Sequence, residues 1–321
     1  MTTLTIASQL DAPVNQAVRQ RLAHRYPGIR LVEVPTGVPS DLPPEATILF
    51  ARPINIRGYQ APLTPPPGWP YGLKWIQLIS SGLDAYPAWL FDEVPVATAR
   101  GSASDIIAEF VLASVFAHNK RLPELWKRDA DWHLTELVPV SGQTLGILGF
   151  GAIGSRLAQK AQALGLRVVA LRQSDAPFEI EGVGAAQDIH ELFALSDHLV
   201  LAAPLSPTTR HIVNAKVLAS AKPGLHLINI ARGGLVDQEA LLDALDNGHL
   251  GLASLDVTEP EPLPDGHPLY SHPRVRLTPH TSAISTNRAE ILSGVLLENL
   301  ERYLRGAPLL NLARFQGGCG R

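Results

Sequence analysis

The chain has 321 residues, of which 45% are hydrophobic and 18% charged, and its formal net charge at pH 7 is -3. This length favours two domains of ordinary size. The slight acidity, with Lys and Arg scattered along the chain, argues against nucleic acid or an anionic membrane surface as a partner. No stretch has the pattern of a signal peptide or a membrane-spanning helix, and a single cysteine, Cys319, excludes an intrachain disulfide, so we expect a cytoplasmic protein.

The first hundred residues alternate short apolar runs with helical or loop segments, which predicts a small α/β unit. Strands are expected near residues 4–7, 29–34, 46–50, 75–79 and 94–97. Residues 102–119 carry apolar side chains at helical spacing and predict a long buried helix, with Ser104 or Asp105 available to cap it.

From residue 144 the pattern changes to tight repeats of strand and helix, which predicts a doubly wound parallel sheet. Residues 287–304 then show helical spacing with no strand after them, so we expect them to pack back on the first domain. The first domain would comprise residues 1–100 and 285–321, and the second residues 101–284. The strands of the second domain are expected near residues 144–148, 167–171, 198–202, 225–230, 251–255 and 275–278.

A glycine-rich turn, GFGAIG at residues 149–154, follows the first strand of the second domain and runs into a helical segment at 155–164. Strand, G-x-G-x-x-G and helix is the order found in dinucleotide sites, because glycines allow a tight turn and let a pyrophosphate approach the helix N-terminus closely. The turn therefore predicts a dinucleotide site. Its members are Gly149, Phe150, Gly151, Ala152, Ile153 and Gly154.

The residue after the second strand bears on which dinucleotide binds. Sites selective for NAD place a carboxylate there to hold the ribose 2′-hydroxyl, whereas this chain has Arg172, followed by Gln173 and Ser174. Guanidinium and hydroxyl groups bind a 2′-phosphate that a carboxylate would repel, so we predict NADP(H), with NAD(H) as the second choice. The alternative, in which Arg172 is a solvated surface charge and Asp175 holds the ribose, stays open.

Three charge-capable side chains each follow one of the last three expected strands. They are Arg232, Glu261 and His280. Since the carboxyl ends of parallel strands share one edge of a sheet, these side chains can converge on one crevice. Taken singly, they are equally well explained as a surface ion pair, a solvated loop charge and a turn histidine. Together, a cation, a carboxylate and an imidazole suit proton transfer to a bound anion.

With the glycine turn, these segments resemble the D-isomer-specific 2-hydroxyacid dehydrogenases over most of the chain. The matching stretches, in the family's order, are GFGAIG, INIARGGLVDQEAL, LDVTEPEPLP and LTPH. The resemblance implies a Rossmann cofactor domain at residues 101–284 and a smaller flavodoxin-like α/β substrate domain built from both chain ends. It also implies a homodimer, and Trp132 matches a position at which relatives join two subunits, although a buried core tryptophan is equally compatible.

The resemblance assigns a role to each of the three side chains. His280 would exchange a proton with the substrate carbonyl, Glu261 would orient the imidazole, and Arg232 would bind the substrate carboxylate. Further substrate contacts are implied in the first domain at Ser81 and Gly82, and Arg52, which follows the strand ending at Phe50, is expected to face the same cleft. Further cofactor contacts are implied at Ala203, Pro204, Thr209, Ile230, Ala231, Asp256 and Ser282. No metal site is expected.

Two departures from the common family pattern narrow the activity. Residues 281–284 lack the glycine that many relatives place after the histidine, and Arg172 replaces the NAD-selective acid. Both resemble the NADPH-preferring glyoxylate and hydroxypyruvate reductase branch. Our leading hypothesis is therefore NADPH-dependent reduction of a small 2-oxoacid to the D-2-hydroxy acid. A bulkier 2-oxoacid, or a nucleotide-sensing relative that is not an enzyme, are the alternatives.

Overall fold

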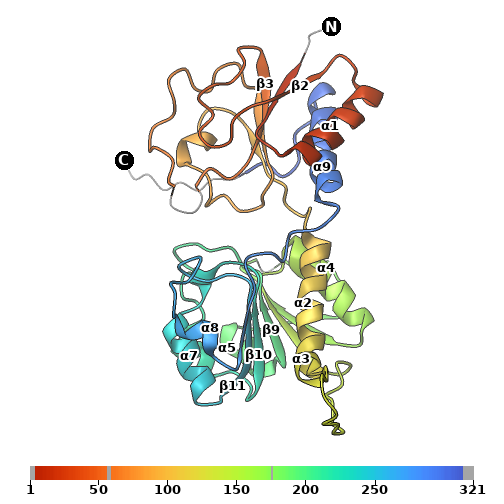
Figure 1. Cartoon of the computed structure of the whole chain (residues 1–321), viewed down its shortest axis with the longest axis vertical. Coiled ribbons are helices and arrows are strands. Elements are labelled where there is room, and N and C mark those ends of the chain that lie inside the picture. The colour runs from red at the N-terminus through yellow and green to blue at the C-terminus, as the bar shows by residue number, and fades with distance from the viewer. Residues whose placement is uncertain (1–3, 56–58, 175, 314–321) are drawn as a thin grey trace. The chain divides into compact units, whose positions relative to one another are not determined.

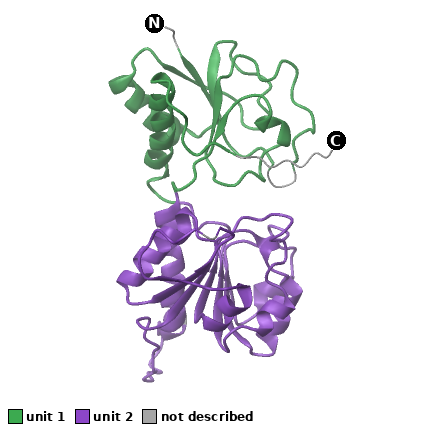
Figure 2. Cartoon of the chain, turned by 180° about the vertical axis from the view of Figure 1, so that it is seen from behind, with its two compact units in different colours: residues 1–102, 285–321 green, residues 103–284 purple. Residues whose placement is uncertain are grey.

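The computed structural model describes residues 4–55, 59–174 and 176–313. The chain divides into two compact units (Figure 2): unit 1 is Met1–Ser102 with Ser285–Arg321, and unit 2 is Ala103–Ile284. Each unit contains a sheet in which every strand pair is parallel. The predicted α/β fold class is thus confirmed. Cys319 lies outside the described residues.

Unit 1 is built on a five-stranded sheet in the order β2-β1-β3-β4-β5. On one face of this sheet α1 (Ala12–Arg25) packs beside α9 (Arg288–Leu304), which comes from the far end of the chain (Figure 1). The 3-10 helix η1 (Ala88–Phe91) packs on the opposite face. The strands are β1 (Thr5–Ser8), β2 (Arg30–Glu33), β3 (Ala46–Ala51), β4 (Trp75–Leu78) and β5 (Val96–Ala97).

Unit 2 is built on a seven-stranded sheet in the order β12-β11-β10-β9-β6-β7-β8. From β6 the sheet extends to one side through β7 and β8 and to the other through β9 to β12. The boundary between β6 and β9 is therefore the topological switch point, where open α/β sheets bind ligands. All six predicted strands are present, but β8 (Val183–Ala185) was missed because its three residues are largely exposed and carry no apolar alternation. The others are β6 (Thr144–Leu148), β7 (Arg167–Leu171), β9 (His198–Leu201), β10 (Leu225–Asn229), β11 (Leu250–Leu255) and β12 (Val275–Leu277).

Helices cover both faces of this sheet (Figure 1). Apolar side chains of α2 (Ser104–Asn119) and α4 (Ala152–Ala163) fill the core on one face. The opposite core is filled from α5 (Ile189–Leu195), α6 (Ala215–Ala219) and α7 (Gln238–Asp246). Short helices α3 (Leu122–Leu125), η2 (Gly233–Leu235) and α8 (Pro268–Ser271) complete the unit. No helix in the described ranges is long and apolar enough to cross a membrane.

The cap predicted for α2 is wrong. Ala103 occupies the N-cap position, and no side chain among the described residues makes the cap hydrogen bond. Ser104 is already inside the first turn with its hydroxyl buried, and Asp105 instead forms an ion pair with Arg156, with an Nε to Oδ1 distance of 3.0 Å. An ion pair with α4 therefore replaces the local cap, because a carboxylate in the first turn of α2 lies within reach of that neighbouring helix.

A buried polar network joins the amino ends of β9 and β10. The Nδ1 atoms of His198 and His226 lie 3.1 Å apart, His198 Nε2 is 2.8 Å from Gln143 Oε1, and His226 Nε2 is 2.9 Å from Ser254 Oγ. With both rings neutral, one proton arrangement satisfies every atom: Ser254 donates to His226, His226 donates to His198, and His198 donates to Gln143. Adding a proton to His198 would place its Nδ1–H against the Nδ1–H of His226.

Acid is therefore expected to destabilise unit 2. Burial, and to a smaller extent the positive charge of a protonated His118, lowers the pKa of His198 to about 4. Burial also lowers the pKa of His226 well below 6.5. As pH falls from 6.5 toward 4, the unfolded chain binds protons that the folded chain does not, so His198 alone removes about 3 kcal/mol of stability. Urea denaturation near neutral pH and near pH 4 measures this loss; an equal loss in His198→Gln would contradict it.

Candidate active site

The three side chains singled out from the sequence follow three neighbouring strands. Arg232 comes after β10, Glu261 after β11 and His280 after β12, and these strands are adjacent and parallel in unit 2. Their carboxyl ends therefore lie along one edge of the sheet, on the side of the switch point that carries β9 to β12.

Glu261 and His280 form a direct pair. His280 Nδ1 lies 2.7 Å from Glu261 Oε1, and both side chains are partly open to solvent. His280 adopts a left-handed backbone with φ of +52°, and its N–H donates to the carbonyls of Asp256 and Thr278 at 2.9 and 3.0 Å. Since the carboxylate holds Nδ1, Nε2 is the nitrogen that can exchange a proton with a bound molecule.

A buried carboxylate anchors the loop that carries His280. Asp256, only 2% exposed, accepts hydrogen bonds from the Thr278 hydroxyl at 2.6 Å and from the N–H groups of Thr281 and Ser282 at 2.9 and 3.0 Å. Burial raises the pKa of this carboxyl, but hydrogen bonds from Ser282, Thr278 and Thr281 outweigh burial and lower the pKa below 3.8. The loop on both sides of His280 is thus tied to the end of β11. Thr278 and Thr281 were not among the predicted site residues.

The backbone before Arg232 is braced by a buried amide. Asn229, 1% exposed, accepts a hydrogen bond from the Ala231 N–H at 3.1 Å and donates to the Arg232 carbonyl at 2.9 Å. The Arg232 guanidinium donates to the Ala231 carbonyl at 2.7 Å and is half-buried. The turn after β10, which includes Ile230, is therefore fixed, and it presents a permanent cation at the sheet edge.

The glycine turn has the geometry that a dinucleotide requires. Gly149 has φ of +96°, and a Cβ there would lie 2.5 Å from the Ala203 nitrogen, so no other residue fits. The helix that follows, α4, begins at Ala152, three residues earlier than predicted, with Gly151 at its N-cap. Within the described residues no side chain caps it and its first turn has no acid, so its N–H groups and dipole fit a pyrophosphate.

Arg172 is held against aromatic rings beside the glycine turn. Its guanidinium carbon lies 5.0 Å from the centre of the Phe178 ring, which in turn packs 4.6 Å from the ring of Phe150. It donates to the carbonyls of Ala176 and, at 2.8 Å, Pro177. Its Nε is buried and has no partner among the described residues. Arg172 is thus a permanent cation held directly after β7.

Comparison with known proteins decides the family. The model described as "D-isomer specific 2-hydroxyacid dehydrogenase, NAD binding domain" matches residues 112–282. This chain belongs to the D-isomer-specific 2-hydroxyacid dehydrogenases. The resemblance predicted from its motifs is confirmed, and the chain is an NAD(P)-dependent oxidoreductase of that family.

Individual members of the family are similar over most of their length. The chain is 32% identical over 250 residues to a glycerate dehydrogenase of Methylorubrum extorquens, covering 74% of this chain and 77% of the relative. It is 34% identical over 230 residues to glyoxylate/hydroxypyruvate reductase A of Serratia proteamaculans, covering 68% and 73%. The structure of a D-isomer-specific 2-hydroxyacid dehydrogenase from Xanthobacter autotrophicus Py2 with NADPH and MES has TM-score 0.80 and 30% identity, covering 97% of this chain and 98% of that one.

The remaining predicted contacts of this dehydrogenase fall at strand ends in both units. Gln173 and Ser174 are exposed after Arg172, and the alternative Asp175 lies outside the described residues. In unit 1, the Ser80 hydroxyl donates to the Gly82 carbonyl at 2.9 Å and so closes the turn that contains Ser81. Ala203, Pro204 and Thr209 follow β9, and Arg52 follows β3.

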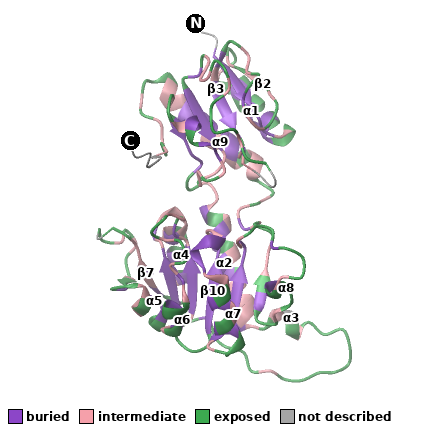
Figure 3. Ribbon diagram, turned by 90° about the vertical axis from the view of Figure 1, so that its left-hand side faces the viewer, coloured by how far each residue is buried: buried purple, intermediate pink, exposed green. Residues whose placement is uncertain are grey.

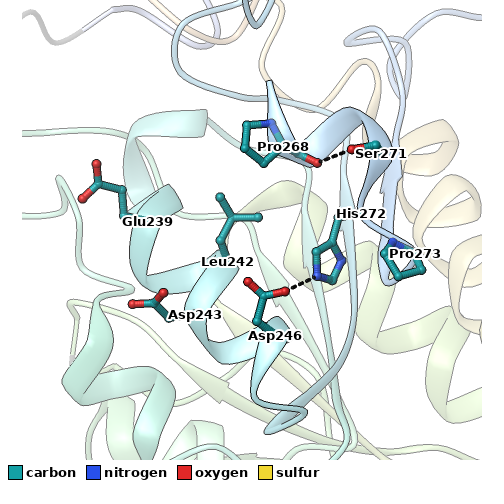
Figure 4. Close-up of a pocket in the computed structure, with 8 residues that line it drawn as sticks. All are labelled: Glu239, Leu242, Asp243, Asp246, Pro268, Ser271, His272 and Pro273. Atoms are coloured by element: carbon teal, nitrogen blue, oxygen red, sulfur yellow. Dashed lines mark hydrogen bonds and ion pairs between the residues drawn. The ribbon is translucent and has the colours of Figure 1, made fainter. Parts of the chain in front are cut away.

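A hollow of the dehydrogenase lies between α7 and α8 (Figure 4), away from these strand ends. His272 Nε2 is 3.2 Å from Asp246 Oδ1, so this imidazole already has a carboxylate partner. The remaining acids are exposed on α7, and no set of three His, Cys, Asp or Glu side chains in the described part of the chain could hold a metal ion. The hollow is lined by Glu239, Leu242, Asp243, Asp246, Pro268, Ser271, His272 and Pro273.

Proposed function

We propose that this dehydrogenase uses NADPH to reduce a small 2-oxoacid, such as glyoxylate or hydroxypyruvate, to the D-2-hydroxy acid. The observation that carries the proposal is the 2.7 Å contact between Glu261 and His280, which follow β11 and β12, on the same sheet edge as Arg232 after β10. A carboxylate-held imidazole near a permanent cation suits a substrate that has both a carbonyl to protonate and a carboxylate to bind. Relatives named glycerate dehydrogenase and glyoxylate/hydroxypyruvate reductase support this choice of acid.

In this proposal the bound cofactor supplies the hydride, and the side chains of the chain handle the proton and the charge. His280 donates a proton from Nε2 to the carbonyl oxygen, while Glu261 keeps Nδ1 engaged and stabilises the protonated ring. Arg232 binds the carboxylate and offsets the negative charge that develops on the oxygen. Oxidation of the hydroxy acid uses the same groups in reverse. Substrate binding by Arg52, Ser81 and Gly82 stays a prediction, as does the cytoplasmic location.

The preference for NADPH rests on Arg172, and replacing it tests that preference. Each charge-assisted hydrogen bond to a 2′-phosphate contributes about 1.5–3 kcal/mol, so Arg172→Ala should raise KM for NADPH on the order of tenfold to a hundredfold. KM for NADH, which lacks that phosphate, should change little. Steady-state kinetics with both cofactors measures the ratio. A parallel rise in both KM values would show that Arg172 only shapes the loop.

We also propose that the chain forms a homodimer through the exposed segment 126–138 that follows α3 (Figure 3). Large apolar side chains that stand in solvent mark an interaction surface, and Trp126 and Trp132 are 71% and 81% exposed. Trp132→Glu should convert a dimer into a monomer with an intact fold, as measured by light scattering and circular dichroism. A monomeric parent chain would contradict the proposal.

The experiment that tests the function follows the absorbance of the reduced nicotinamide with a panel of 2-oxoacids. Glyoxylate, hydroxypyruvate, pyruvate and bulkier 2-oxoacids are each offered with NADPH and with NADH. Preference for glyoxylate and hydroxypyruvate with NADPH supports the proposal. Preference for a bulky acid would contradict the proposed substrate, and faster turnover with NADH would contradict the proposed cofactor. If no acid led to oxidation of the cofactor, the alternative of a nucleotide-sensing protein would be favoured.

A further inference from the structure

Four contacts converge on Glu259, two residues before Glu261. Its carboxylate forms a two-pronged ion pair with Arg210, with N to O distances of 2.6 and 2.7 Å. Its backbone is held from both sides by the amide of Gln238, which donates to the Glu259 carbonyl at 2.6 Å and accepts from its N–H at 3.1 Å. Side chains from two other segments of unit 2 thus fix this one residue.

The backbone around Glu259 is also in close contact with the turn after β10. A Cβ on Gly233 would lie 2.0 Å from the carbonyl carbon of Thr258 and 2.5 Å from the nitrogen of Glu259. The Thr258 hydroxyl donates to the Pro260 carbonyl at 2.9 Å. The turn after β10, which carries Arg232, therefore presses directly on the segment that leads to Glu261.

The segment that joins Glu259 to Glu261 is conformationally restricted. In Glu259-Pro260-Glu261-Pro262 each proline ring fixes its own φ near -65°. Each glutamate precedes a proline and is restricted to extended conformations. Few torsions therefore remain free between Glu259 and Glu261, so the position of Glu259 determines where the Glu261 carboxylate meets His280.

Arg210 is itself held in place. It follows Thr209, whose hydroxyl donates to the Pro204 carbonyl at 2.7 Å, and the next residue, His211, donates its N–H to the Gly234 carbonyl at 2.8 Å. The Arg210 and Glu259 side chains are 49% and 41% exposed. An exposed ion pair contributes only about 0–1 kcal/mol to folding. Its geometry therefore matters more for the placement of Glu261 than for the stability of unit 2.

We propose that Arg210 and Gln238 are positioning residues, which act through Glu259 to hold Glu261 against Nδ1 of His280. This inference rests on the proposed function for its catalytic consequence, although the placement of Glu261 can be measured without turnover. Misplacing a reacting group by about 1 Å can cost on the order of a hundredfold in rate. Partial loosening through one lost anchor should therefore lower kcat on the order of tenfold.

The first readout is the Nδ1 proton of His280 in the full-length protein labelled with 15N-histidine. Its resonance, identified among the 11 histidines by its loss in His280→Ala, lies at low field while Glu261 accepts the hydrogen bond. We expect Arg210→Gln and Gln238→Ala to broaden this resonance or move it upfield. Arg19→Gln is the matched control, since Arg19 pairs with Glu33 at 2.8 Å in unit 1 with 48% and 49% exposure. An unchanged resonance in both variants overturns the proposal.

The second readout is the pH profile of kcat/KM for the preferred 2-oxoacid. Both variants should lose kcat on the order of tenfold. As pH rises, kcat/KM for reduction should begin to decline at a lower pH in the variants than in the parent, because the protonated ring has lost its carboxylate partner. The double variant Arg210→Gln/Glu259→Gln should lose no more than Arg210→Gln alone, since both changes break one unit. Additive losses, or an unshifted profile, overturn the proposal. If the parent chain reduces no acid, the proposed function fails and the resonance alone decides the positioning role.

Discussion

His280→Ala is expected to lower kcat for 2-oxoacid reduction by about 10²–10⁴-fold, the range contributed by a positioned general acid. The loss follows from the geometry of the pair: Nδ1 is held 2.7 Å from the Glu261 carboxylate, so Nε2 is the atom that delivers the proton. Binding of NADPH should be almost unchanged, because the glycine turn and Arg172 lie at β6 and β7, on the other side of the switch point. Steady-state kinetics and calorimetric titration with NADPH measure the two effects separately.

His272→Ala supplies the control for this substitution. It removes another imidazole of unit 2 that also has a carboxylate partner, Asp246 at 3.2 Å, but one that lies between α7 and α8 instead of at the strand ends. Its kcat should match that of the parent chain. If His280→Ala kept more than about a tenth of parental turnover, far above what loss of a general acid allows, the proton would have to come from another group.

The positions of Arg232 and Glu261 could be predicted because the strands before them are mostly apolar, whereas the strand before His280 is shorter and has the exposed Arg276 in its middle. Leu225–Asn229 and Leu250–Leu255 are almost wholly buried, and runs of that kind identify central parallel strands by composition alone. Once the strands are parallel in one sheet, the residues after β10, β11 and β12 must share an edge. The glycine turn was predictable for a similar reason, since φ of +96° at Gly149 demands glycine.

The contacts that orient those side chains could not be predicted. Asp256 binds Thr278 and Thr281, and Gln238 binds Glu259, across separations of 21 to 25 residues that no spacing rule covers. The start of α4 and the cap of α2 were predicted wrongly because both predictions used only nearby residues. The glycine turn decides where α4 begins, and an ion pair with α4 takes the place of a cap on α2. Tertiary hydrogen bonds therefore supply the detail that hydrophobic pattern leaves open.

Asp256→Asn is expected to have the second largest effect, on stability and on turnover together. The buried carboxylate accepts three hydrogen bonds, whereas an amide has one acceptor oxygen and would turn its NH₂ group toward the N–H donors of Thr281 or Ser282. Each buried donor left unpaired costs about 1–3 kcal/mol. The loop that holds His280 at φ of +52° would lose its anchor, and kcat should fall on the order of a hundredfold.

The pH dependence of stability identifies the anchored carboxylate as the cause. Because the pKa of Asp256 is lowered below 3.8 in the folded chain, its contribution to the free energy of unfolding is complete above that value and is lost as pH falls through the folded pKa. The stability difference between the parent and Asp256→Asn should therefore be largest near neutral pH and shrink in acid. Asp243→Asn, an exposed change on α7, should show no difference at any pH. A weaker Kd for NADPH with unchanged stability would instead show that Asp256 contacts the cofactor directly, as the sequence had suggested.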